Sequence, residues 1–254
     1  MKASEIMERR NKIIALVLTN GYLSTEEACQ LFQVSNETIR QDFLKLEKQH
    51  ILKRSHGGAS AFESDIVAPI AERQSDNFNY KYLIAKKALE YLPQGGGVVG
   101  MDMGSTVSLM ADLMEDTSGY LIITSSHPVL QKIIRSKNRL YNLGGEYNPI
   151  DMAYQGEQTA SALKKLSLDV TFIGTSGVMN RGGICSRDFH DINIKQAFIQ
   201  QSKKIIILTD SSKFTTTSLV EVAPWDQIHM IITDSRIPES IAEEMRAMVE
   251  LVIV

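Results

Sequence analysis

The chain contains little cysteine, and its histidines are scattered. Of 254 residues only two are cysteines, Cys29 and Cys185, and neither belongs to a Cys-x-x-Cys or Cys/His cluster. The five histidines show no metal-ligand spacing either. A disulfide framework and a zinc site therefore have no support, and each cysteine is expected to pack as a small hydrophobic residue. We expect no metal and no cofactor.

Long hydrophobic runs are also absent. No apolar stretch approaches the ~18 residues that suggest a membrane span, and the chain opens with a charged amphipathic segment instead of a signal peptide. The composition, 43% hydrophobic and 22% charged, is sufficient for a packed core and for two domains. The sequence therefore predicts a soluble, cytoplasmic protein without a membrane partner.

A strong positive charge is missing too. The net charge is −3, but residues 1–60 carry nine basic and seven acidic residues, a net charge of +2, and the remainder carries 18 basic and 23 acidic residues. Such a small basic excess cannot by itself supply strong affinity for nucleic acid. Binding to DNA would depend on a few well-placed cations and polar groups, acting in an oligomer.

The segment VSNETIRQDFLKLEKQ, residues 34–49, predicts a helix with a polar outer face on its first turns. Ser35 can accept hydrogen bonds from the first amides, and Val34 and Ile39 occupy the two positions of a hydrophobic staple. Ile39, Phe43 and Leu46 form one apolar stripe. The polar side chains of the outer face are Asn36, Glu37, Thr38, Arg40, Gln41 and Lys45.

Two more helices are expected before this segment. Residues 5–19 have apolar side chains at helical spacing, and Ser24 to Glu27 match a capping box that opens a short second helix. A short helix, a tight turn and a helix with an exposed polar start form a helix-turn-helix, whose later helix enters the DNA major groove. The alternative is a three-helix interaction module with a merely solvated polar face.

A small hairpin is predicted after the third helix. Residues 51–54 are typical of a short strand and residues 56–58 of its turn, which together would form a wing that follows the DNA phosphates. The resulting candidate DNA-binding residues are Ser35, Asn36, Glu37, Thr38, Arg40, Gln41, Lys45, Lys53, Arg54, His56 and Gly57.

The remainder of the chain predicts an α/β domain. Residues 60–79 have no sustained period and are interpreted as a linker with a short helix near 70–74, and a helix at 80–92 opens the second domain. Short apolar runs then alternate with helical segments, which favours a largely parallel sheet with ligands beyond the carboxyl ends of its strands. The expected strands are 98–101, 120–124, 139–143, 170–174, 204–209, 230–233 and 251–254, and the expected helices are 106–114, 128–136, 156–165, 191–201 and 238–249.

The predicted organisation is therefore an α/β effector domain with a largely parallel sheet, preceded by a small winged helix-turn-helix domain. The domain bounds are 1–59 for the DNA-binding domain, 60–79 for the linker and 80–254 for the effector-binding and oligomerisation domain. Residues 95–100 match GxGxxG, but these glycines precede a strand, whereas the dinucleotide fingerprint follows a strand and opens a helix. A nucleotide site is therefore not expected there.

Several loops after predicted strands are typical of anion binding. Asp102-Met103-Gly104-Ser105-Thr106 stands between a strand and a helix, where free amides and the helix dipole favour phosphate, although a plain capping turn is the alternative. Ser125 and Ser126, Gly144 and Gly145, and Gly174 follow other strands. Lys213 follows a further predicted strand and could pair with phosphate or with Asp210. Lys195, on a predicted helix, is a weaker candidate, because a lysine in such a position is more often solvated.

These motifs resemble the DeoR family of bacterial transcription regulators over nearly the whole chain. VSNETIRQDFLKLEKQ followed by ILKRSHGGA is similar to the family's N-terminal signature, and DxGST, TSS, LGG, DVTFIGTSG, DSSKF and ITD stand in the family's order. Four positions depart from the family pattern. Gln41 stands where the family usually has arginine, and His50 stands where it usually has glycine. Ser125, in the TSS motif, stands in place of a usual asparagine, and Asp191 stands in place of a common glutamate, whose side chain is longer.

The resemblance implies a repressor of a sugar or related catabolic operon, released by a phosphorylated metabolite that binds a domain resembling ribose 5-phosphate isomerase. The expected partners are double-stranded operator DNA, a phosphorylated sugar effector and further copies of the chain in a dimer or tetramer. The alternatives are an isomerase-like enzyme with an attached DNA-binding unit and an oligomerisation module without a ligand. The expected effector-binding residues are Asp102, Gly104, Ser105, Thr106, Ser125, Ser126, Gly144, Gly145, Gly174, Lys195, Asp210 and Lys213.

Overall fold

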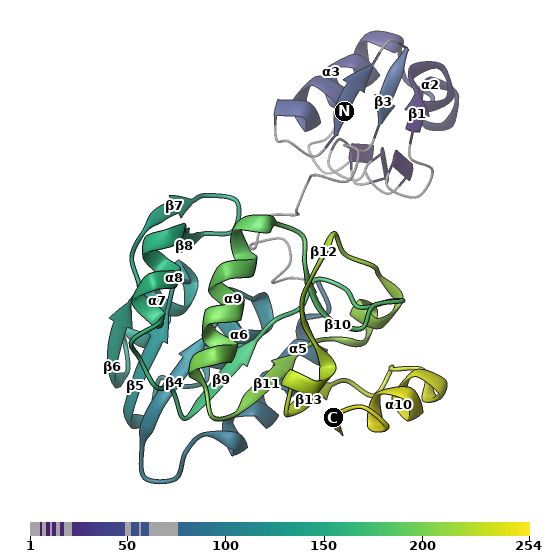
Figure 1. The fold of residues 1–254 in the computed structure, drawn as a ribbon. Coiled ribbons are helices and arrows are strands. Elements are labelled where there is room, and N and C mark those ends of the chain that lie inside the picture. The colour runs from purple at the N-terminus through teal and green to yellow at the C-terminus, as the bar shows by residue number, and fades with distance from the viewer. Residues whose placement is uncertain are drawn as a thin grey trace. The chain divides into compact units, whose positions relative to one another are not determined.

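The computed structural model divides the chain into two compact units, Met1–Val67 and Ala68–Val254 (Figure 1). The residues described are 6, 9, 10, 12, 13, 16, 17, 22–48, 52–55, 57–60 and 76–254. Most of the predicted linker, including its helix near 70–74, lies outside them, and so does His50.

The first unit combines helices with a three-stranded antiparallel sheet. The described residues between 6 and 17 are helical, as predicted for 5–19, and α2 (Thr25–Phe32) and α3 (Asn36–Lys48) follow. In the sheet, β3 (Gly58–Ser60) lies between β1 (Tyr22–Ser24) and β2 (Lys53–Ser55). The sequence reading missed β1, because three residues are too few to show an alternating pattern. The wing hairpin was predicted.

Local sequence signals set the helix boundaries of this unit. The capping box is formed, since the Glu27 amide donates to Ser24 Oγ at 3.1 Å and the Ser24 amide donates to Glu27 Oε2 at 3.0 Å. Asp42 on α3 is buried and accepts from Arg9 Nε and Arg10 Nε, both at 2.7 Å. These two ion pairs join the N-terminal helical residues to α3. The core contains the predicted stripe, with Ile39, Phe43 and Leu46 fully buried.

The second unit is built on a seven-stranded parallel sheet with the order β14-β13-β11-β9-β4-β5-β6. All seven predicted strands are present within one or two residues of their expected ends. The observed bounds are β4 (Gly97–Met101), β5 (Ser118–Thr124), β6 (Lys137–Asn142), β9 (Val170–Ile173), β11 (Ile205–Leu208), β13 (Met230–Thr233) and β14 (Glu250–Ile253).

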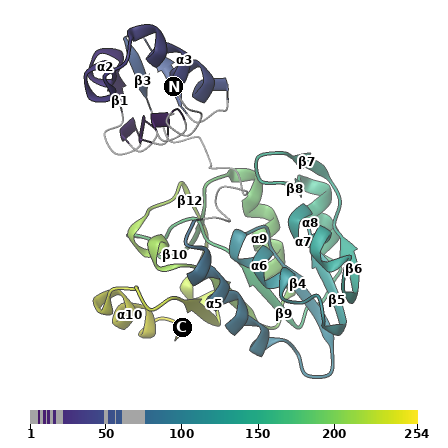
Figure 2. The same ribbon diagram turned by 180° about the vertical axis from the view of Figure 1, so that it is seen from behind.

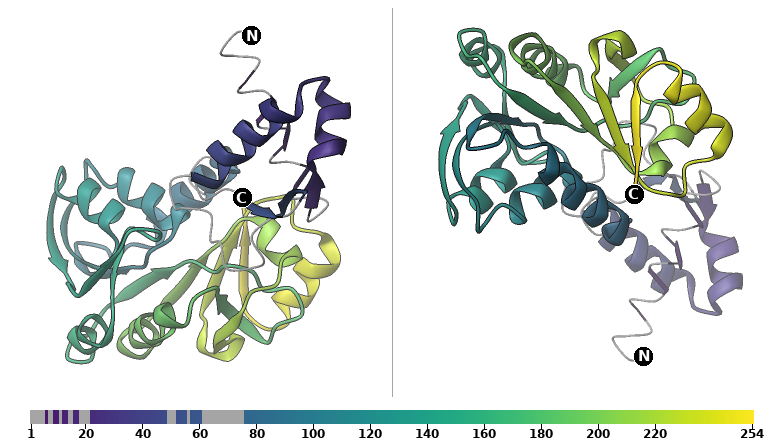
Figure 3. Two further views of the ribbon diagram at one scale, coloured as in Figure 1. Left: turned by 90° about the horizontal axis from the view of Figure 1, so that it is seen from above. Right: turned by 90° about the horizontal axis from the view of Figure 1, so that it is seen from below.

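Helices cover both faces of this sheet (Figures 2 and 3). Successive strand side chains point to opposite faces, so Ile206 and Leu208 enter one hydrophobic cluster while Ile205 and Ile207 enter the other. The helices packed on the Ile206 face are α5 (Phe78–Ala88), α6 (Ser105–Asp112) and α7 (His127–Ile133). Those on the other face are α8 (Glu157–Leu163), α9 (Phe189–Gln201) and α10 (Glu239–Arg246).

Two short antiparallel pairs were not predicted. The hairpin of β7 (Glu146–Asn148) and β8 (Ala153–Gln155) follows β6, and β10 (Gly183–Ser186) pairs with β12 (Val220–Pro224). None of the four lies in a continuous apolar run of the kind from which the buried strands were predicted. The described part of the unit also contains three short 3-10 helices, η1 (Leu89–Tyr91), η2 (Ser211–Thr215) and η3 (Trp225–Gln227).

The glycines of the GxGxxG match serve packing at the amino end of β4. A Cβ added to Gly96, whose φ is 109°, would lie 2.4 Å from the carbonyl oxygen of Gly119, so a larger residue would force two loops apart. Gly95 and Gly96 precede β4 as predicted, whereas Gly97 is the first residue of the strand, one residue before its expected start. In the described part of the chain, no helix combines the length and apolar character needed to cross a bilayer.

Candidate functional site

The first turn of α3 has the predicted cap and an exposed polar face. The Thr38 amide donates to Ser35 Oγ at 3.2 Å, and the two hydroxyl oxygens of these residues are 2.8 Å apart. Gln41 Nε2 donates to Glu37 Oε1 at 2.8 Å, so this pair occupies one side of the exposed turn. Arg40 is exposed on the same helix. Lys45, one turn further on, is exposed as well.

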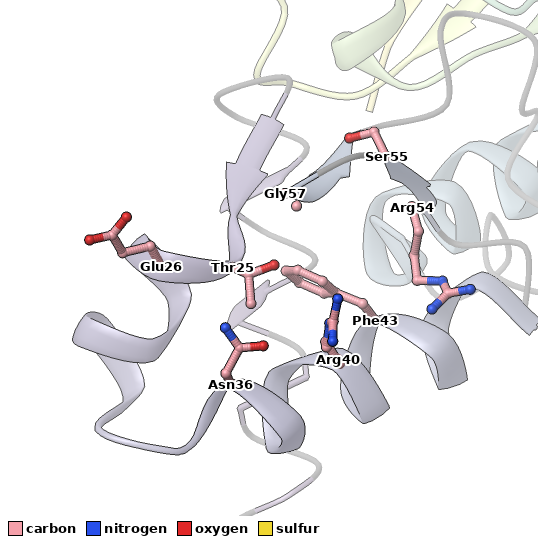
Figure 4. Close-up of a pocket in the computed structure, with 9 residues that line it drawn as sticks. Thr25, Glu26, Asn36, Arg40, Phe43, Arg54, Ser55 and Gly57 are labelled. Carbon is pink, nitrogen blue, oxygen red and sulfur yellow. The ribbon is translucent and has the colours of Figure 1, made fainter.

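A groove of about 860 Å³ separates the start of α3 from the wing (Figure 4). Arg40 and Arg54 bring two guanidinium groups to its walls, and Glu26 is the one acidic residue among the described lining residues. A polar groove with two cations beside an exposed helix end is suited to a polyanion. The lining residues are Thr25, Glu26, Asn36, Arg40, Phe43, Arg54, Ser55, Gly57 and Gly58.

Hydrogen bonds join the wing to the helices on both sides of the groove. Arg54 donates twice to Glu47 of α3, from Nε to Oε2 at 2.6 Å and from its amide to Oε1 at 3.1 Å, and these bonds lower the pKa of Glu47. The Thr25 amide donates to the Gly57 carbonyl at 2.7 Å. Lys53 lies in β2, but its side chain is outside the described part of the structure, as is the whole of His56.

In the second unit, the predicted loops meet at one edge because the strands that precede them are parallel. The chain leaves β4 towards β5 and β6 on one side and returns to β9, β11 and β13 on the other, so the order reverses between β4 and β9. Crevices at such reversals are where ligands bind in open α/β sheets. Asp102 follows β4 and Gly174 follows β9, and the Gly174 amide donates to Asp102 Oδ2 at 3.2 Å.

Lys195 is buried at this reversal point. Its Nζ pairs with Asp102 Oδ2 and donates to the Gly174 carbonyl at 3.1 Å, and only 3% of the residue is exposed. The alternative for this weaker candidate, a solvated surface lysine, is therefore excluded. The local pattern of α9 could not reveal the pairing with Asp102, because this partner lies 93 residues away in sequence.

Asp191 completes a buried triad with Lys195 and Asp102. It lies one helical turn before Lys195, its Oδ2 is 3.5 Å from Lys195 Nζ, and it accepts from Ser186 Oγ at 2.8 Å. The shorter aspartate side chain thus still reaches the lysine. Burial raises the pKa of Asp191 to about 7, although Lys195 opposes this rise. Burial alone would lower the pKa of Lys195, but the two carboxylates outweigh it and raise that pKa.

At this edge, the buried oxygen atoms without a hydrogen-bond partner among the described residues include Asp102 Oδ1, Asp191 Oδ1 and Ser125 Oγ. Met101 pairs with Thr124, so Asp102 and Ser125 occupy neighbouring strand ends. Unpaired buried oxygens are costly, and a bound ligand with hydroxyl groups would satisfy them. The neighbouring Ser126 has a structural role instead, since its Oγ accepts from the Val129 amide at 3.4 Å and caps α7.

The start of α6 lies directly after Asp102 in the chain. Gly104 is the residue before the helix and supplies no side chain to cap it, so the first amides of α6 have no side-chain cap at that position. A Cβ added to Gly104 would lie 3.6 Å from the Gly174 Cα, which shows how closely the two loops approach. Ser105 and Thr106 are both buried on the first turn. A helix start of this kind can receive an anion.

Gly144 and Gly145 follow β6 with φ values of 67° and 116°. A Cβ on Gly145 would lie 2.1 Å from Thr159 Oγ1, whereas one on Gly144 would meet open space. Thr159 Oγ1 donates to the Gly144 carbonyl at 2.6 Å and holds this turn against α8.

Asp210 caps the 3-10 helix that bears Lys213. Its Oδ1 accepts from the Ser212 amide at 3.2 Å and from Ser212 Oγ, and it also accepts from Asn77 Nδ2 at 3.1 Å. The Lys213 amide donates to the Asp210 carbonyl at 3.1 Å, and the Lys213 carbonyl accepts from the Val178 amide. These bonds place the Lys213 backbone in the loop that follows β11.

Sequence reasoning did not identify three residues that contribute to this edge. Asp151, in the turn between β7 and β8, is buried, and its charge contributes to the raised pKa of Asp191. Ser186 and Asn77 bond to the acidic residues described above. Each lies in a turn or a weakly patterned segment, so its contacts depend on the tertiary fold and not on a local motif.

Comparison with known proteins assigns both units. The family model described as a DeoR-like helix-turn-helix domain matches residues 9–65, and that described as a DeoR C terminal sensor domain matches residues 76–235. The glycerol-3-phosphate regulon repressor of Escherichia coli strain K12 is 31% identical over 237 residues, covering 93% of this chain and 94% of the relative. The HTH-type transcriptional regulator IolR of Bacillus subtilis is 27% identical, covering 92% and 91%.

Solved structures similar to this chain include ribose 5-phosphate isomerase A from Methanocaldococcus jannaschii. The similarity has a TM-score of 0.40 and 16% sequence identity, and it covers 54% of this chain and 55% of the isomerase.

Proposed function

The chain belongs to the DeoR family of bacterial transcription regulators, and we propose that it represses a sugar or related catabolic operon and releases its operator when a phosphorylated sugar or polyol binds. The relatives that match over nine-tenths of the chain are named as regulators, which removes the isomerase alternative. Operator DNA, a small phosphate ester and further copies of the chain are its proposed partners, and the cytoplasm is its proposed location.

DNA binding is assigned to the groove between α3 and the wing. Asn36 and Arg40 are proposed to reach base edges, because they lie on the exposed first turns of the helix that enters the major groove. Arg54, Gly57 and the remaining candidate residues of the wing are proposed to contact phosphates. The small positive charge of residues 1–60 makes each of these contacts important, and it favours binding as a dimer or tetramer.

The effector site is assigned to the carboxyl edge at the β4/β9 reversal. The observation that carries this proposal is the buried Lys195–Asp102–Asp191 triad, in which two carboxylate oxygens have no donor in the described structure. Hydroxyl groups of a sugar or polyol would donate to these oxygens. A phosphate dianion would be repelled by them, and it is proposed to bind the first amides of α6 beside Ser105 and Thr106, with Lys213 as a cation.

The remaining candidate residues have supporting roles in this proposal. Ser125 is proposed to donate to or accept from a ligand hydroxyl, while Gly144, Gly145 and Gly174 let the backbone approach the ligand closely. Ser126 and Asp210 hold the loops that carry them. The proposed domain bounds remain 1–59, 60–79 and 80–254.

Operator binding and its reversal can be tested together. We would measure fluorescence anisotropy of labelled DNA from upstream of the gene and its neighbouring operon, against scrambled DNA at fixed salt, while titrating glycerol 3-phosphate and a panel of pentose and hexose phosphates. Arg40→Ala should weaken specific binding by about 1–3 kcal/mol, because one base-edge contact is lost. Arg139→Ala, an exposed arginine on β6 of the second unit, is the matched control.

Specific binding reversed by one phosphate ester would support the proposal and identify the inducer. Specific binding that no phosphate ester changes, together with an unchanged melting temperature for every ester, would contradict the effector assignment, since a ligand that binds only the folded state must stabilise it. Equal affinity for upstream and scrambled DNA across several candidate operators would contradict the repressor assignment.

A further inference from the structure

One side chain ties the start of α5 to the carboxyl edge of the sheet. Asn77 precedes α5, its Nδ2 donates to Asp210 Oδ1 at 3.1 Å, and its Oδ1 accepts from Arg236 Nη1 at 3.1 Å. The two bonds use both ends of a single amide group. Asn77 can therefore keep both bonds only while Asp210 and Arg236 stay in their present relative positions.

Arg236 is itself held in a defined orientation. Its Nε and its amide donate to Asp234 Oδ1 at 2.8 and 3.2 Å, and its guanidinium carbon lies 3.5 Å from the centre of the Tyr80 ring. Asp234 is fully buried and also accepts from the amide and hydroxyl of Ser211, at 2.7 and 3.0 Å. The ends of β11 and β13 and the first turn of α5 thus form one closed hydrogen-bonded network.

The backbone of Asn77 is part of the same arrangement. Its φ is 54° and its ψ is 29°, a left-handed conformation that is uncommon outside glycine, and its carbonyl accepts from the Tyr80 and Lys81 amides at 3.0 Å. The first turn of α5 therefore starts from a residue whose position depends on Asp210 and Arg236. Asn180 has a similar φ of 57° in an exposed turn, which makes it a matched reference.

We propose that Asn77 and Arg236 are the positioning residues through which a ligand at the carboxyl edge alters DNA binding. This inference rests on the proposed function, in which the Asp210–Lys213 loop is part of the effector site. A ligand that moves this loop changes the Asp210–Asn77 hydrogen bond and, with it, the start of α5. In the sequence, α5 comes after the segment that follows the DNA-binding unit. We therefore expect a change at the ligand site to be transmitted to this segment through the start of α5.

The physical requirement for such coupling is a contact that differs between two states of the protein. We expect the Asp210–Asn77 hydrogen bond to be this contact, because the carboxylate that accepts from Asn77 belongs to the loop that carries Lys213. If Asn77 lost its side chain, ligand and DNA could each still bind, but neither would change the affinity for the other.

The test uses the full-length protein with Asn77→Gly, which removes the amide while keeping a residue that tolerates the left-handed backbone. Asn180→Gly is the control, and the ligand is the phosphate ester that raises the melting temperature of the wild type most. In the wild type and in Asn180→Gly, the operator Kd should change on saturation with ligand by a factor of about 5–150. In Asn77→Gly this factor should fall to within about twofold of one, while the ligand-induced rise in melting temperature persists.

Arg236→Lys supplies a second variant. It keeps the positive charge but lacks the separate nitrogens that bridge Asp234 and Asn77, so it should lower the coupling factor in the same way. A full coupling factor in Asn77→Gly, with ligand and operator both bound, would overturn the proposal. A role limited to stability would lower the melting temperature and leave the coupling factor unchanged.

A ligand-independent measurement separates this proposal from the proposed function. Asp210→Ala should increase hydrogen–deuterium exchange in a peptide covering residues 77–84, whereas Asp188→Ala, which removes the cap of α9, should not. If no phosphate ester affects the wild type, the effector assignment fails, and the exchange result then decides the structural link by itself. Unchanged exchange in Asp210→Ala would overturn that link.

Discussion

Lys195 and Asp102 form a buried ion pair across the point where the strand order of the sheet reverses. The side chains are 4% and 0% exposed, and 93 residues separate them in the sequence. Each charge depends on the other, because a buried charge without a partner is strongly destabilising. This pair also holds the Gly174 turn next to the start of α6, so it shapes the proposed ligand site as well as stabilising the unit.

Lys195→Met should therefore lower the free energy of unfolding of the second unit by about 3–5 kcal/mol, since it leaves two buried carboxylates without their cation. Urea unfolding followed by fluorescence provides the measurement, because Trp225, the one tryptophan of the chain, is buried in the second unit and reports on that unit alone. The double variant Lys195→Met with Asp102→Asn should recover part of the loss. An unchanged urea midpoint in Lys195→Met would contradict the structural role of the pair.

Asp191 predicts a specific pH dependence. Its folded-state pKa of about 7 lies above the value of about 3.9 for an unfolded aspartate, so the folded protein binds more protons between these values. The contribution of Asp191 to the free energy of unfolding should therefore fall as pH rises from about 4 to about 7, and then level off. Asp191→Asn cannot titrate, so its stability relative to the wild type should increase over that range. Calorimetry of both proteins between pH 4.5 and 8 tests this, and a difference that is constant with pH would refute it.

Gly144 and Gly145 offer a matched pair of substitutions. Gly144→Ala should cost about 1–2 kcal/mol, because only the left-handed backbone is strained and the added Cβ meets open space. Gly145→Ala should cost about 3 kcal/mol or more, since its Cβ would also collide with Thr159 Oγ1 and the Gln155 carbonyl oxygen. Urea midpoints of the two variants give the comparison. Equal losses would show that the Thr159 contact does not constrain this turn.

Gln41 stands where the family usually has an arginine. Gln41→Arg should increase affinity for operator and scrambled DNA together, and should make the slope of log K against log salt concentration steeper by about 0.9, as expected for one added phosphate contact. Gln30→Arg, an exposed substitution on α2 outside the groove lining, is the control. An increase limited to the operator would instead indicate that position 41 contacts a base.

The two-unit organisation and most of the secondary structure could be predicted from local signals. The capping box at Ser24, the cap at Ser35 and the seven apolar runs each depend on residues close together in the sequence, where periodicity and capping act. The short strands β1, β7, β8, β10 and β12 could not be predicted in this way. β1 pairs with β3 and β10 with β12, partners that are distant in the sequence, and β7 and β8 form a local hairpin of three-residue strands that are too short to show an alternating pattern.

The sequence by itself determined which residues follow the parallel strands, and hence that Asp102, Ser125, Gly144, Gly174 and Asp210 would share one edge. Only the tertiary structure decided which of them meet. It placed Lys195, a weaker candidate from the sequence, between two carboxylates, and joined Asn77 to both Asp210 and Arg236. The physical reason is that hydrophobic periodicity records which face of an element is buried, whereas strand order and long-range packing select the partners that lie against it.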